Sequence, residues 1–71
     1  MKTAWTDQDI RELAAAAVLN ALDDADDDGT MTQTFESEME FQLAAPEHAN
    51  RRKPTRHQMN LARVIWKGAL A

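Results

Sequence analysis

The chain has no cysteine and no tyrosine, and it contains only two glycines and two prolines among 71 residues. Without cysteine, the fold cannot contain a disulfide framework, a thiolate zinc site, an iron–sulfur cluster or a cysteine nucleophile. The two glycines form no glycine-rich loop of the kind that cradles phosphates. Composition therefore excludes several classes of enzyme and metalloprotein, and the lack of cysteine leads us to expect a reducing, cytoplasmic compartment.

Long apolar runs are also missing. The longest, residues 13–19, is far shorter than the roughly 18 or more residues that a membrane span requires. The first twelve residues hold one early lysine and three acidic residues, unlike the layout of a secretory signal. Hydrophobic residues make up 44% of the chain and charged residues 28%, which is typical of a globular domain. We therefore expect a single domain over residues 1–71 without a membrane partner.

Charge is divided unevenly along the chain. Residues 1–47 contain all twelve acidic residues and two basic ones, whereas residues 48–71 contain six basic residues and no acidic one. The formal net charge of −4 hides this separation. We predict that the opposite charges are there to meet another molecule, rather than being fully paired within the chain.

Helical spacing of apolar residues predicts a small all-α domain of three helices. We place them at residues 6–22, 35–45 and 55–67, joined by an acidic loop at 23–34 and a basic loop at 46–54. Most apolar residues at this spacing are expected to form the core.

Capping signals mark the expected helix ends. A hydroxyl residue followed three positions later by an acidic or amide residue satisfies free backbone groups at a helix start. Gly68 is a natural stop for the last helix. The expected start signals are Thr6 with the apolar pair Trp5 and Ile10, Ser37 with Glu40, and Thr55 with Gln58.

The middle segment has a second interpretation. Apolar residues there alternate as in a strand and also share one helical stripe, so an α+β fold with a short hairpin at 30–43 is the alternative. The absence of β-branched residues between Thr34 and Thr55 favours the helix.

In the first and third predicted helices, helical spacing predicts that Leu22 and Val64 face the core.

The sequence from Asp24 to Thr32 reads D-A-D-D-D-G-T-M-T and resembles the first nine positions of an EF-hand calcium loop. The resemblance implies calcium held by carboxylates and a backbone carbonyl, and makes a calcium-binding module one alternative function. The last ligand position of that family falls on Phe35, with the nearest acid one residue later. The alternative is a solvated acidic linker that binds no ion. The candidate metal ligands are Asp24, Asp26, Asp28, Thr30 and Glu36.

Basic residues and a tryptophan gather in the last third of the chain. Lysine and arginine bind phosphate backbones, and arginine and tryptophan are enriched at the centres of protein interfaces. Nucleic-acid binding through the basic C-terminal helix is therefore a second alternative. The candidate partner-binding residues are Arg51, Arg52, Lys53, Arg56, Arg63, Trp66 and Lys67.

No catalytic pattern is evident. The two histidines, His48 and His57, have no nucleophile at a recognisable spacing, so we expect a non-enzymatic protein without a cofactor, calcium aside. The small size, lack of cysteine and charge layout resemble the small host-directed regulators of bacteriophages, several of which bind RNA polymerase or nucleases. The resemblance implies docking on a larger macromolecular machine such as RNA polymerase. A homodimer is a further possibility.

Overall fold

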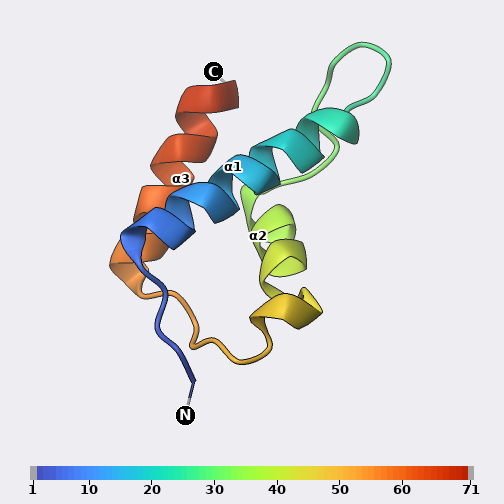
Figure 1. Cartoon of the computed structure of the whole chain (residues 1–71). Coiled ribbons are helices and arrows are strands. Elements are labelled where there is room, and N and C mark those ends of the chain that lie inside the picture. The colour runs from blue at the N-terminus through green and yellow to red at the C-terminus, as the bar shows by residue number, and fades with distance from the viewer. Residues whose placement is uncertain (1, 71) are drawn as a thin grey trace.

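The computed structural model describes residues 2–70, and α-helices make up most of this part of the chain (Figure 1). The elements in chain order are α1 (Asp7–Asp23), α2 (Phe35–Leu43), the short 3-10 turn η1 (Pro46–His48) and α3 (Arg56–Leu70). No strand forms in the described residues, where an isolated bridge pairs Thr3 with Arg51. The all-α fold class is confirmed, and the alternative hairpin at 30–43 is wrong because that segment contains α2.

Two of the three helix starts follow the predicted capping signals. In α1, the Thr6 hydroxyl accepts a hydrogen bond from the Asp9 backbone N–H at 3.0 Å, and the Asp9 carboxylate accepts one from the Thr6 N–H at 3.2 Å. In α3, Thr55 and Gln58 form the same reciprocal pair at 3.1 and 3.0 Å. These bonds satisfy backbone donors that the helix itself leaves free.

α2 begins at Phe35, as predicted, but its capping pair differs from the prediction. Thr34 is the capping residue, and its hydroxyl accepts from the Ser37 N–H at 3.1 Å while the Ser37 hydroxyl accepts from the Thr34 N–H at 3.1 Å. The predicted pair of Ser37 with Glu40 is wrong, because Thr34 has the extended backbone that a cap requires and Ser37 already lies inside the helix.

The helix ends also differ from the prediction. α2 ends at Leu43, and Ala45 is extended because the proline that follows disfavours a helical conformation there. α3 continues through Gly68 to Leu70, so Gly68 is not its stop. A glycine inside a helix costs roughly 1 kcal/mol relative to alanine, which the packed helix tolerates.

α1 is the central element, and both α2 and α3 pack against it. Small side chains at their contact, Ala14 and Ala17 on α1 and Ala62 on α3, are fully or almost fully buried and permit close approach. The backbones of α2 and α3 scarcely approach each other. The buried core cluster consists of Trp5, Ile10, Leu13, Ala14, Ala17, Phe35, Met39 and Ala62.

Two residues expected in the core lie outside it. Leu22 is 49% exposed and Val64 is 68% exposed. Each lies off the buried face of its helix, since Leu22 follows buried Ala21 by one residue, about 100° of rotation, and Val64 follows buried Ala62 by two.

The acidic loop and the basic loop lie at different ends of the molecule (Figure 1). The acidic loop projects beyond the last turn of α1, whereas the basic loop runs beside the N-terminal segment. The Cα atoms extend over 44 × 23 × 15 Å, so the molecule is elongated. Among the helices of residues 2–70, none is long and apolar enough to span a membrane.

Candidate functional site

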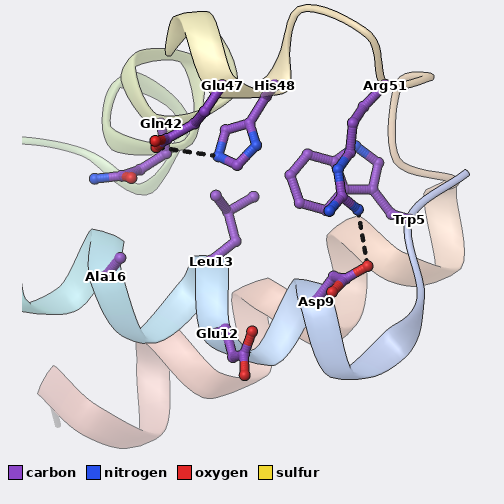
Figure 2. A pocket seen from close by; sticks show the side chains of 9 residues that line it. All are labelled: Trp5, Asp9, Glu12, Leu13, Ala16, Gln42, Glu47, His48 and Arg51. Carbon is purple, nitrogen blue, oxygen red and sulfur yellow. Dashed lines mark hydrogen bonds and ion pairs between the residues drawn. The ribbon is translucent and has the colours of Figure 1, made fainter. Parts of the chain in front are cut away.

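Arg51 is held within the fold. Its guanidinium donates to the Asp9 carboxylate at 2.8 Å and lies 4.3 Å from the centre of the Trp5 ring (Figure 2). Its backbone pairs with Thr3, which fixes the basic loop to the N-terminal segment. The hydrogen bond from Arg51, followed by those from Thr6, lowers the pKa of Asp9 below its ordinary range.

A hollow of about 200 Å³ lies beside Arg51 (Figure 2). The His48 ring packs against Trp5 with ring centres 4.9 Å apart, and His48 Nε2 lies 3.8 Å from the Glu47 carboxylate. The lining offers carboxylates and an imidazole but no hydroxyl or thiol nucleophile. It consists of Trp5, Asp9, Glu12, Leu13, Ala16, Gln42, Glu47, His48 and Arg51.

Two other predicted partner-binding residues contact α2. Trp66 is half-buried and packs edge-on against Phe35, with ring centres 5.8 Å apart. The Arg63 guanidinium lies 5.0 Å from the centre of the Phe35 ring and donates to Glu36 at 3.5 Å. Trp66 and Arg63 thus join α3 to the start of α2, and their role in partner binding stays a prediction.

The remaining predicted partner-binding residues are exposed and unpaired. Within residues 2–70, none of these four side chains takes part in an ion pair. The same holds for the five aspartates of residues 23–28. Neither charged segment is therefore neutralised by the other within the described chain. The four basic residues are Arg52, Lys53, Arg56 and Lys67.

The acidic loop is closed by its own hydrogen bonds. The Asp26 carboxylate accepts from the backbone N–H groups of Asp28 at 3.0 Å and Thr30 at 2.8 Å, and the Thr30 carbonyl accepts from the Asp26 N–H at 3.1 Å. Gly29 takes φ 79°, a left-handed conformation that favours glycine. These bonds already occupy two of the predicted ligand residues.

The remaining predicted calcium ligands are dispersed. Asp24 is at the end of α1, Asp28 is exposed in the loop, and Glu36 lies on α2, where it contacts Arg63. In the described part of the chain, no three or more acidic or histidine side chains are placed to hold a metal ion. Calcium binding stays an untested prediction.

A larger, apolar groove opens where α2 and the start of α3 diverge. Its volume is about 520 Å³. Sequence reasoning missed it because apolar residues at helical spacing were assigned to a closed core, whereas Leu43 and Met59 are only partly buried. The lining consists of Glu36, Met39, Glu40, Leu43, Ala44, Lys53, Pro54 and Met59.

No family model matches the chain, and no curated protein or solved structure matches it significantly.

Proposed function

We propose that this chain is a small, non-enzymatic, cytoplasmic regulator that docks on a larger protein, for which a bacterial RNA polymerase is the first candidate. The observation that supports this most directly is the apolar groove between α2 and the start of α3. Both helices pack on α1 and diverge from each other, which leaves a position that a further helix fits.

The groove has the chemistry of a helix-binding site. Its floor is formed by flexible or apolar side chains, among them Met39, Leu43 and Met59, which adapt well to a partner's apolar side chains. Glu36 and Glu40 lie one helical turn apart on the α2 wall, and Lys53 lies on the loop side. These charges favour an amphipathic partner helix with basic residues toward α2 and acidic residues toward the basic loop.

The unpaired basic residues support docking through a second effect. Arg52, Lys53 and Arg56 are exposed near the groove end formed by the basic loop. Exposed charges contribute little to affinity but raise the rate of encounter with an oppositely charged surface, and this effect weakens with salt. We therefore expect the partner surface around its docking helix to be acidic.

The direct test blocks the groove without disturbing the core. Ala44 is exposed and lines the groove, so Ala44→Arg places a long side chain there. Ala15 is exposed on α1 and is not among the lining residues, so Ala15→Arg is a matched control with the same charge change. We expect purified bacterial RNA polymerase, or another host protein identified by mass spectrometry, to bind the parent and Ala15→Arg but to lose at least tenfold affinity for Ala44→Arg.

A second variant tests the charged surface. Arg52→Glu with Arg56→Glu reverses two exposed charges that are not among the groove's lining residues, whereas Arg51 is avoided because it contacts Trp5 and Asp9. We expect slower association with little change in dissociation rate. Equal binding by Ala44→Arg and Ala15→Arg would exclude the groove as the docking site. If neither the parent nor any variant binds polymerase, docking on polymerase is rejected.

Nucleic-acid binding is the second candidate, because Arg56, Arg63 and Lys67 are spaced to share one face of α3. If these residues contact phosphates, gel mobility shifts with duplex DNA or RNA should appear at low salt and weaken steeply as salt rises. Substitution of Lys67 by Gln should then reduce the salt dependence, since one phosphate contact is lost.

A further inference from the structure

A second hollow, of about 290 Å³, lies between the end of α1 and the flank of α2 that faces away from the groove. Residues on this flank fall at different helical positions from those that line the groove, so the two surfaces are separated by α2 itself. The hollow is lined by Asn20, Asp24, Gln33, Ser37, Glu38 and Phe41.

The hollow contains a buried carboxylate without a cation. Glu38 is only 3% exposed, and its Oε2 accepts a hydrogen bond from the Asn20 side-chain amide at 3.2 Å. In residues 2–70 no basic side chain forms an ion pair with Glu38. Its Oε1 has no hydrogen-bond partner there, and the Glu38 side chain lines the hollow. Burial of a carboxylate is costly unless a partner compensates it.

Surrounding groups make the hollow attractive to positive charge. The C-terminal end of α1 carries the negative end of the helix dipole, and no basic residue lies in its last turn. Asp24 caps that end and also lines the hollow. The carboxylates of Glu38 and Asp24 and the negative end of α1 would therefore all attract a bound cation.

The size and lining favour an organic cation over a bare ion. A volume of about 290 Å³ exceeds the roughly 30 Å³ share of a water molecule several times over. Phe41 is 66% exposed and provides an aromatic face on which a cationic side chain stacks. A guanidinium is planar, forms several hydrogen bonds at once and stacks on aromatic rings, so it fits both features better than an ammonium does.

We propose that this hollow is a recognition pocket for an arginine side chain of a partner protein. Glu38 Oε1 accepts from the guanidinium, Asp24 adds negative charge, and Phe41 covers its face. The assignment to a partner protein rests on the proposed docking function, but the pocket is testable without the partner.

The test uses nuclear magnetic resonance titration of the full chain with N-acetyl-arginine methylamide. The citrulline analogue is the neutral control of the same shape, and the lysine analogue and calcium chloride are titrated in parallel. We expect saturable amide shifts confined to the lining residues, with a millimolar dissociation constant for arginine, weaker binding of lysine and none of citrulline. Equal binding of citrulline would overturn the proposal, as would stronger calcium binding at the same amides.

Matched variants isolate the contributing groups. Glu38→Gln keeps the shape and removes the charge, and we expect arginine binding to weaken at least fivefold. Asp7→Asn removes an exposed carboxylate at the opposite end of α1, where it is not among the lining residues of the hollow or of the groove, and binding should be unchanged. Phe41 lies outside the core, so Phe41→Leu should leave the fold intact, and it should weaken binding about threefold through loss of the aromatic face. Unchanged binding in both Glu38→Gln and Phe41→Leu would overturn the proposal.

The two proposals fail separately. If Ala44→Arg still binds the partner while Glu38→Gln loses arginine, the groove is excluded and the pocket stands. If Ala44→Arg loses the partner while free arginine does not bind, the pocket is excluded and the groove stands.

Discussion

Arg51 differs from its basic neighbours because its side chain is bound within the fold. Arg51, Arg52 and Lys53 are equivalent in a one-dimensional sequence, and all three were predicted to bind a partner. In the fold, Arg51 donates a hydrogen bond to Asp9, which lies 42 residues earlier in the sequence, and its guanidinium packs on the Trp5 ring. Sequence reasoning could not separate the three because the distinction depends on where the N-terminal segment lies.

The Asp9–Arg51 contact predicts a pH dependence of stability. The pKa of Asp9 is lowered in the folded state by Arg51 and Thr6, so the unfolded chain binds a proton more readily. Stability from this contact is therefore complete above about pH 4 and is lost as the pH falls toward the lower folded-state value. Thermal melts from acidic to neutral pH should show a smaller acid-induced loss in Asp9→Asn than in the parent. Identical curves would contradict the prediction.

Burial at single positions gives a second test. Ile10 is fully buried in the core, whereas Val64, which its spacing predicts to face inward, is 68% exposed. We expect Ile10→Ala to cost about 2–5 kcal/mol and Val64→Ala to stay within about 0.5 kcal/mol. Urea unfolding followed by circular dichroism measures both. A large loss from Val64→Ala would place it in the core after all.

At the scale of elements, helix starts were recoverable where the signal is local. Thr6 and Thr55 each cap a helix through a residue three positions on, as predicted. The start of α2 at Phe35 was predicted, but its capping pair was misassigned because Thr34 and Ser37 are both good caps, and nothing in the local sequence ranks them. The end of α3 was missed because Gly68, a residue type that often follows the end of a helix, here lies inside one.

The two capping assignments for α2 are separable by mutation. If Thr34 is the cap, Thr34→Ala should cost about 0.5–2 kcal/mol, whereas Glu40→Gln should have almost no effect. Chemical denaturation of both variants gives the two values. A larger loss for Glu40→Gln than for Thr34→Ala would restore the predicted pair of Ser37 and Glu40.

For the molecule as a whole, the fold class followed from the sequence but the surfaces did not. Both the groove and the hollow around Glu38 arise from the way α2 leaves α1, and no spacing rule encodes that angle. The sequence does not distinguish Glu38 from the neighbouring acidic residues Glu36 and Glu40. Its burial and its bond to Asn20 become visible only in three dimensions.

The unpaired acidic loop predicts a response of the whole molecule to salt. Asp27 and Asp28 are exposed near the negative end of α1, so their repulsion should weaken as salt is added. Raising sodium chloride from about 50 mM to about 500 mM should raise the melting temperature of the parent by about 2–4 °C. Asp27→Asn with Asp28→Asn should melt higher at low salt and respond less. An equal response would mean that the loop charges do not oppose folding.

The dominance of the α1–α3 contact affects how the chain folds during synthesis. α1 is made early, but the helix that covers most of it begins only at Arg56. Since ribosomes add roughly 5–20 residues per second, the apolar face of α1 stays uncovered for several seconds, until α3 has been synthesised. A nascent chain stalled before Arg56 should therefore be open to chaperones and proteases, and release of the α3 segment should end that exposure.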